Sequence, residues 1–178
     1  MTTNVAAYQA VASGAPLEKG TVERRDLRPD DIRIEIEFAG ICHSDIHTVR
    51  EEWGPIEFPM VPGHEIIGRV TEVGSEVRKF TVGERAGVGC LVDSCRECEW
   101  CLKGEENNCP QAVGTYNGKD RFDGRPTDGG YSTEIIVSEA FALHIPESLD
   151  PAATTPLLCA GITTVSYTHL RAHETKAN

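Results

Sequence analysis

The stretch DIRIEIEF, residues 31–38, is the clearest structural signal in this 178-residue sequence. Apolar and charged residues alternate strictly along it, and the apolar positions are Ile32, Ile34, Ile36 and Phe38. Successive side chains of a β-strand point to opposite faces, so this alternation predicts a strand with one face against a core. The stretch runs into Gly40 and delivers Cys42 at the end of the predicted strand.

Further strand signals lie on the C-terminal side of this stretch. EIIGRVTEVG (65–74) has a strand pattern, and its interior Gly68 suggests a bulge or a close backbone approach. YSTEIIV (131–137) and FALHI (141–145) predict two more strands. A mostly β chain is therefore expected.

Two segments predict short helices between or after these strands. HSDIHTVREEW (43–53) has helical character, with Ser44 or Asp45 as its N-cap and Gly54-Pro55 closing it. Asp150-Pro151 is a good N-cap and N1 pair for a second helix, which Pro156 would interrupt.

Composition narrows the class of partner. Apolar residues make up 39% and charged residues 25%, which is ordinary for a globular chain with a packed core. The formal net charge is -11 and the basic residues are scattered among acids, which disfavours nucleic acid. Neither a membrane-spanning apolar run nor a secretion signal occurs, so we expect a cytoplasmic protein without a membrane partner.

Four of the seven cysteines crowd into CRECEWCLKGEENNC, residues 95–109. A reducing cytoplasm disfavours disulfide staples. A ferredoxin-type iron–sulfur pattern would have three residues before its last cysteine, whereas seven separate Cys101 from Cys109, and the flanking residues are strongly polar. Four closely spaced thiolates satisfy a tetrahedral zinc ion and leave no open position. We therefore favour a closed, structural zinc site at Cys95, Cys98, Cys101 and Cys109, with an iron–sulfur cluster as the alternative.

This zinc would order a region that has little else to hold it. Residues 95–128 are polar, rich in Gly, Asn and Asp, and almost without periodicity. Such a segment has little apolar surface to bury. We call residues 90–112 the cysteine lobe.

Other candidate residues are Cys42, the pair His64-Glu65, and Cys159. Taken alone, a single cysteine is usually a small buried hydrophobe. The motifs around these residues favour a functional role instead. The motifs are GICHSDIH (40–47), PGHEIIGRVTEVG (62–74) and PLLCAGITT (156–164).

In order along the chain, these motifs, the cysteine lobe and GGYSTEIIV (129–137) resemble the N-terminal, catalytic part of a zinc-dependent medium-chain alcohol dehydrogenase. The pattern is closest to the cinnamyl-alcohol-dehydrogenase branch with its NADP-linked aldehyde reductases. The resemblance covers about residues 6–164. It implies a GroES-like, mostly antiparallel β-barrel with short helices and a structural-zinc lobe.

The resemblance also implies roles for individual residues. Cys42, His64 and Cys159 match the ligands of a catalytic zinc. Glu65 matches a catalytic acidic neighbour that can approach the metal when the fourth ligand exchanges. Ser44 matches a hydroxyl beside the substrate oxygen, and His47 matches the distal member of a proton relay. Without the family, His43 and His47 would be interpreted as a surface pair on a short helix.

The remaining matches concern the cofactor and the substrate. His43 matches a position near the cofactor pyrophosphate, Thr163 one near the nicotinamide, and Trp53 one in the substrate pocket. Cys90 has no assigned partner and is expected to be a core thiol.

The resemblance stops near the C-terminus. A complete family member continues into a dinucleotide-binding Rossmann domain with G-x-G-x-x-G, and no such pattern occurs in these 178 residues. We therefore expect a catalytic domain at 1–150, the start of a linker to a missing Rossmann domain at 151–164, and a tail at 165–178. The tail, VSYTHLRAHETKAN, departs from the family and resembles a cloning or assembly artefact; its alternative role is a metal pair at His169 and His173.

The functional hypothesis is a C-terminally truncated oxidoreductase that interconverts primary alcohols and aldehydes with NADP(H). The fragment is expected to bind one catalytic and one structural zinc but to be inactive alone, because nothing in it holds the cofactor. A homodimer is expected for the full-length parent. Alternatives are a zinc- or iron–sulfur-ordered binding or electron-transfer module, and a quinone-reductase-like relative without zinc.

Overall fold

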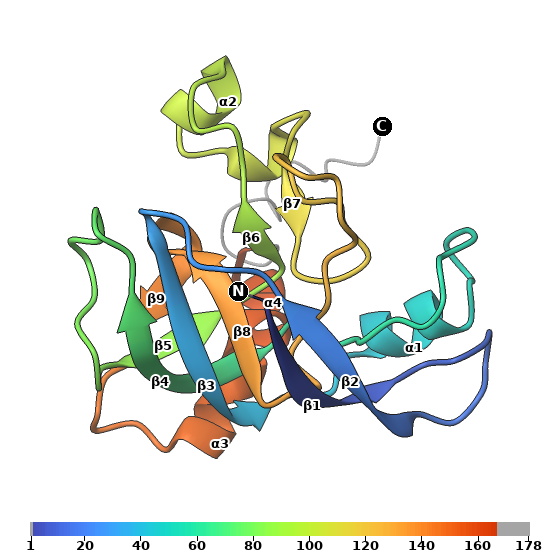
Figure 1. Ribbon diagram of the computed structural model, residues 1–178. Coiled ribbons are helices and arrows are strands. Elements are labelled where there is room, and N and C mark those ends of the chain that lie inside the picture. The colour runs from blue at the N-terminus through green and yellow to red at the C-terminus, as the bar shows by residue number, and fades with distance from the viewer. Residues whose placement is uncertain (1, 167–178) are drawn as a thin grey trace.

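A five-stranded antiparallel sheet forms the centre of the protein, whose computed structural model describes residues 2–166. The strand order is β8-β3-β4-β5-β9, and the sheet curls into a half-barrel (Figure 1). The bounds are β3 Asp31–Ala39, β4 Ile66–Val73, β5 Arg85–Val88, β8 Glu134–Ser138 and β9 Ala142–His144.

Two smaller sheets and several short helices complete the fold. β1 (Thr3–Gln9) pairs with β2 (Glu18–Arg24), and β6 (Leu91–Asp93) with β7 (Val113–Gly114). The α-helices are α1 His43–Val49, α2 Glu99–Leu102, α3 Pro151–Thr154 and α4 Ala160–Ser166. The 3₁₀ turns are η1 Glu106–Asn108, η2 Glu139–Phe141 and η3 Thr155–Leu158. The predicted mostly β architecture with short helices is confirmed.

The main core lies on one face of this sheet. Strand β3 pairs with β4 on one side and β8 on the other, which makes it central. Its Ile32 and Ile34 are fully buried, and each such side chain stabilises the fold by about 2 kcal/mol. Their buried partners from the neighbouring strands are Ile66, Val70, Ile135 and Val137.

The alternation of residues 31–38 correctly predicted this strand, but the burial that it predicted for two side chains is wrong. Phe38 is 39% exposed, because the β3–β4 register shifts between Ile36 and Phe38. Asp31 is buried rather than outward, since its carboxylate accepts hydrogen bonds from the Arg25 side chain and from the Arg28 amide.

Gly68 is required by a close backbone approach, as predicted. A Cβ at this position would lie 2.0 Å from the Glu35 carbonyl oxygen on β3. Any side chain would therefore push β4 away from β3 near the same irregular part of the ladder.

The predicted helices form, with two corrections to the first, which ends at Val49 and not near Trp53. The N-cap of α1 is Cys42, not Ser44 or Asp45. Asp45 instead occupies the third helical position, and its carboxylate accepts the Cys42 amide at 2.9 Å. Asp150 caps α3 as predicted, accepting from the Ala153 amide at 2.8 Å, and the helix gives way to η3 at Thr155.

The cysteine lobe begins in the main core, where Val92 of β6 is buried, and its α2 projects away from the central sheet at the top of Figure 1. Among the described residues, no helix is both long enough and apolar enough to cross a membrane. The division of the chain at residue 150 stays a prediction. Val165 and Ser166 close α4, while the rest of the predicted tail, with His169 and His173, lies outside the described residues.

Candidate metal centres

The first candidate centre brings together three side chains that are far apart in the sequence. Cys42 follows β3, His64 precedes β4, and Cys159 lies between η3 and α4. One donor atom from each lies within 4.8 Å of the others, and the Cys42 and Cys159 Sγ atoms are 3.9 Å apart. Two thiolates on one tetrahedral zinc ion would be about 3.8 Å apart, so the sulfur separation fits this metal. We call these residues the cleft cluster.

Asp45 orients the histidine of the cleft cluster. Its Oδ1 lies 3.1 Å from His64 Nδ1 and accepts the Gly63 amide at 3.1 Å. Tyr131 donates its hydroxyl to the other carboxylate oxygen at 3.1 Å. With Nδ1 engaged, Nε2 is the ring nitrogen left for a ligand. A carboxylate behind a metal-binding histidine fixes its tautomer and ring orientation in this way.

Burial and hydrogen bonding act in opposite directions on this pair. Burial alone raises the pKa of Asp45, but hydrogen bonds from His64 and from the Cys42 and Gly63 amides hold its pKa below the usual value. Burial alone lowers the pKa of His64, but the contact with Asp45 outweighs it and raises that pKa. Asp45 therefore stays a carboxylate. Sequence analysis assigned it only as a possible helix cap.

Glu65 lies behind the cluster and is 2% exposed. Its Oε1 accepts the Ala160 amide at 3.1 Å, directly after Cys159. A Cβ at residue 40 would lie 2.2 Å from the other carboxylate oxygen, so only glycine fits there. The Glu65 carboxylate thus ties the Cys159 segment to the barrel.

The predicted relay residues lie on α1. Ser44 Oγ is 3.5 Å from Cys42 Sγ, and His47 Nδ1 contacts the Glu52 carboxylate, which sequence analysis did not identify. The His47 contact lowers the pKa of Glu52. Among the interactions of the described residues, none joins Ser44 directly to His47. The His47 ring lies 4.5 Å from His43 and 5.0 Å from Trp53, measured between centroids.

A cleft of about 280 Å³ opens onto the cleft cluster. Its walls come from α1, from the segment after β5 and from the segment after β7, and comprise Ser44, Thr48, Trp53, His64, Cys90, Thr115, Tyr116, Asn117 and Cys159. Neither His43 nor Thr163 lines it; both are exposed, the latter one helical turn beyond Cys159.

Cys90 is not the core thiol that we expected. It is exposed and lines the cleft beside Cys159. The chain leaves the core at the end of β5, and a Cβ on the next residue, Gly89, would lie 3.0 Å from the Leu158 carbonyl oxygen. Cys90 therefore lies beyond the end of β5, where the chain runs against η3, and is not part of the core strand.

The second candidate centre is the cysteine lobe. One donor atom from each of Cys95, Cys98, Cys101 and Cys109 lies within 4.8 Å of the others. Sulfur separations of 3.8 Å (Cys95–Cys101), 3.6 Å (Cys98–Cys101) and 3.5 Å (Cys109–Cys95) fit four thiolates on one ion. All seven cysteines are free, so disulfide staples are not found.

Backbone amides favour thiolate in the lobe. The Cys98 amide donates to Cys95 Sγ at 3.3 Å, and the Gln111 amide to Cys109 Sγ at the same distance. Amide hydrogen bonds, the largest from Glu97, lower the pKa of Cys95 to about 6. Metal ligation requires the deprotonated sulfur, so these amides prepare the site for a cation.

Arg96 joins the lobe to the barrel. Its guanidinium pairs with Asp30, contacts Ser138 Oγ at 3.2 Å and lies 3.4 Å from Asp93. Asp30 precedes β3 and Ser138 ends β8, so this side chain, which lies between two of the lobe's cysteines, links residues 95–109 to the central sheet.

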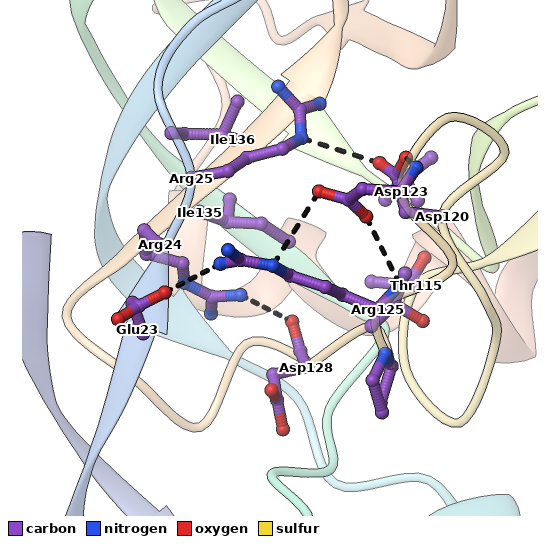
Figure 2. A pocket seen from close by; sticks show the side chains of 13 residues that line it. Glu23, Arg24, Arg25, Thr115, Asp120, Asp123, Arg125, Asp128, Ile135 and Ile136 are labelled. Atoms are coloured by element: carbon purple, nitrogen blue, oxygen red, sulfur yellow. Dashed lines mark hydrogen bonds and ion pairs between the residues drawn. The ribbon is translucent and has the colours of Figure 1, made fainter. Parts of the chain in front are cut away.

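Figure 2 shows a second cavity, lined mainly by charged side chains from β2 and residues 115–128. Arg24 is 7% exposed and donates to the carbonyls of Asp128, Gly129 and Glu134. Burial lowers its pKa to about 10. Arg125 pairs with Glu23 and Asp123. These contacts link β2 to the later chain.

Comparisons with known proteins identify the family of this fold. The family model described as the alcohol dehydrogenase GroES-like domain matches residues 28–147. The chain is 58% identical over 166 residues to NADP-dependent alcohol dehydrogenase C 1 of Mycolicibacterium smegmatis, covering 92% of this chain and 47% of that protein. It is 58% identical over 153 residues to probable formaldehyde dehydrogenase AdhA of Bacillus subtilis, covering 85% and 44%.

A solved structure gives the same result. The structure of CAD from Helicobacter pylori complexed with NADP(H) has a TM-score of 0.91 and 40% sequence identity, covering 93% of this chain and 48% of that one. The chain thus spans about half the length of the relatives it matches.

Proposed function

The chain belongs to the alcohol dehydrogenase family through its GroES-like domain, and we propose that it is the zinc-binding catalytic part of an NADP(H)-dependent enzyme that interconverts primary alcohols and aldehydes. The observation that carries this proposal is the convergence of Cys42, His64 and Cys159, of which His64 and Cys159 line a cleft together with Ser44. Two thiolates, one imidazole and an open side are the donor set of a catalytic zinc ion.

The metal's contribution is simple. A zinc ion in such a site supplies Lewis acidity toward a substrate oxygen. Asp45 engages Nδ1 of His64, which leaves Nε2 for the metal, and Glu65 holds the segment that carries Cys159. Both carboxylates maintain the donor geometry, and Glu65 lies behind the cluster, where it could also approach the metal when the fourth ligand exchanges.

Proton movement is assigned to residues of α1 and the turn after it. Ser44 lies at the cleft wall beside Cys42, where its hydroxyl can accept the proton that an alcohol loses. His47 is held by Glu52 and is partly exposed, so it can pass that proton on to water. A substrate hydroxyl or cofactor hydroxyl would have to bridge Ser44 and His47, since the two are not in contact.

The substrate and cofactor assignments extend this proposal. Trp53 and Tyr116 form an aromatic part of the cleft wall suited to an aldehyde with an apolar body. His43 and Thr163 are exposed, and we assign them to cofactor contacts. NADP(H) is preferred over NAD(H) because relatives are named NADP-dependent and one solved relative holds NADP(H).

The proposal is tested by metal content and turnover of the purified 178-residue chain. We expect a colourless protein with about two zinc ions, falling to about one in Cys42→Ser. We expect no steady-state aldehyde reduction with NADPH, because no dinucleotide-binding glycine motif occurs in these residues. Visible charge-transfer bands would favour the iron–sulfur module instead. Unchanged zinc in Cys42→Ser would overturn the catalytic site, and turnover would overturn the inactivity.

A further inference from the structure

Arg24 is a buried, charged residue that the proposed reaction does not use. It ends β2 and is 7% exposed. A buried charge is costly unless its donors are hydrogen-bonded. The guanidinium of Arg24 donates to four acceptors, which are the carbonyl oxygens of Asp128 (2.6 Å), Gly129 (2.8 Å) and Glu134 (2.9 Å) and the Oγ of Ser132 (2.7 Å). Figure 2 shows this side chain directed at Asp128. Arg24 therefore holds one segment, residues 128–134.

The held segment lies directly against the residues that lead into His64. The amides of residues 129, 130 and 131 donate to the carbonyl oxygens of residues 61, 63 and 62, at 2.7, 2.9 and 3.0 Å respectively. In the reverse direction, the Val61 amide donates to Asp128 Oδ1 at 3.0 Å. The two backbones are so close that a Cβ on Gly129 would lie 2.3 Å from the Gly63 carbonyl oxygen. Residues 128–131 thus align residues 61–63.

The same segment also reaches Asp45, the carboxylate behind His64. Tyr131 donates its hydroxyl to Asp45 Oδ2 at 3.1 Å. The Gly63 amide and His64 Nδ1 contact the other carboxylate oxygen, each at 3.1 Å. Arg24 is therefore connected to His64 in two ways, through the backbone of residues 61–63 and through the side chains of Tyr131 and Asp45.

We propose that Arg24 is a positioning residue for the cleft cluster, which fixes residues 128–131 and, through them, the ring of His64. This inference rests on the proposed function, because it takes the cluster to be a zinc site. An arginine suits the task, since its planar guanidinium donates to several carbonyl oxygens at once, whereas the ammonium of a lysine is a compact point charge. Arg24 is not among the residues that line the cleft, so it acts only through its neighbours.

Positioning and simple stabilisation have different consequences for zinc. An arginine that only stabilised the fold would leave the zinc affinity of the folded protein unchanged. A positioning arginine affects the cleft cluster alone, because the ligands of the cysteine lobe come from residues 95–109. Outer-shell partners change metal affinity about 10- to 100-fold, and Arg24 lies further from the metal, so we expect about a three- to tenfold loss in Arg24→Lys.

The first measurement tests the link between Arg24 and the held segment. Hydrogen–deuterium exchange of the 178-residue chain as purified, read by mass spectrometry, compares wild type with Arg24→Lys. The amides of residues 129–131 and of Val61 should exchange at least about tenfold faster in the variant, while the ladder between β3 and β4 keeps its protection. Unchanged exchange in residues 129–131 would overturn the proposal.

The second measurement is a competition titration of the zinc-loaded chain with a zinc chelator. Arg24→Lys should weaken one of two sites about three- to tenfold and leave the other unchanged. Ile34→Val is the matched control, because it removes a buried methylene from the main core and destabilises the fold without touching residues 128–131. It should leave both zinc affinities unchanged.

A milder variant covers the case in which Arg24→Lys does not fold. Ser132→Ala removes one of the four Arg24 contacts and should weaken the same zinc site about two- to threefold.

The outcomes separate this proposal from the proposed function. Equal zinc affinity in wild type and Arg24→Lys, or an equal loss in Ile34→Val, would overturn the positioning role. A wild-type chain that holds only the lobe ion would instead overturn the proposed function. In that case the exchange pattern still decides whether Arg24 fixes residues 128–131.

Discussion

The cysteine lobe and the cleft cluster use the same thiol chemistry but are assembled in different ways. In the lobe, all four sulfurs come from 15 consecutive residues. In the cleft cluster, Cys42 and Cys159 are 117 positions apart, and His64 comes from a third segment. The first site needs only short loops between ligands, whereas the second needs the central sheet to be in place.

The surroundings of the two sites differ accordingly. Lobe sulfurs accept hydrogen bonds from backbone amides close to them in sequence, such as Cys98 to Cys95. The cleft cluster depends on the buried carboxylates of Asp45 and Glu65, which connect α1, β4 and the Cys159 segment. A site whose ligands are close together in the sequence can therefore be predicted from their spacing. A site whose ligands come from distant segments cannot.

The largest expected effect is a selective loss of the lobe metal in Cys98→Ser. A structural site with three thiolates should bind zinc at least about a hundredfold more weakly, because such sites derive their folding energy from complete ligation. Bound zinc should fall from about two to about one per chain, and residues 95–109 should become sensitive to proteases.

The cleft cluster provides the control for this variant. Cys42→Ser should lose one zinc while the lobe stays protease-resistant. If Cys98→Ser lost both metals, the two sites would not be independent.

A smaller effect is expected for Asp45→Asn, which removes the charge behind His64 but keeps the shape. Loss of an outer-shell carboxylate typically weakens metal affinity about 10- to 100-fold. Competition titration with a zinc chelator should show this weakening at one site only. An unchanged affinity would mean that His64 is oriented by packing alone.

The third prediction concerns a region that contacts neither site. Asp120 pairs with Arg28 and accepts the Phe122 and Asp123 amides. Burial alone raises the pKa of Asp120, but these contacts outweigh it and lower that pKa to about 2, below its usual value of 3.8. Because the folded-state pKa is depressed, the carboxylate stabilises the fold above about pH 4, and this contribution disappears as the pH falls toward 2.

Thermal unfolding tests this third prediction. At pH 6, Asp120→Asn should lower the free energy of unfolding by about 1 kcal/mol or less. The difference in Tm between wild type and variant should shrink as the pH falls through 4 toward 2. A constant difference would show that Asp120 acts without its charge. Metal loss at low pH affects both proteins and cancels in the comparison.

Sequence analysis identified the strands because alternation and burial are local properties. It placed Phe38 and Asp31 on the wrong faces, since a register shift and an arginine contact are set by neighbouring segments. The metal site of the cysteine lobe was predicted from the spacing of its four cysteines and from the polar residues around them. The cleft cluster was reached only through resemblance to a family.

The residues that sequence analysis missed share one property. Their roles depend on neighbours that are distant or unmarked in the sequence: Asp45 contacts His64, Glu52 contacts His47, and Cys90 lines the same cleft as Cys159. Asp45 lies three residues after Cys42, and Glu52 five after His47, spacings too common to indicate a pair. The position of Cys90 in the cleft wall could not be predicted without knowing that β5 ends beside η3.

The most direct test of this difference is a urea titration of the zinc-loaded chain with a chromogenic chelator present, following both metal release and unfolding of the sheet by circular dichroism. The account predicts two steps: one zinc leaves at the midpoint of sheet unfolding, and the second stays bound to higher urea because its four ligands need no distant segment. Release of both ions in a single step at the sheet midpoint would contradict a lobe that assembles locally.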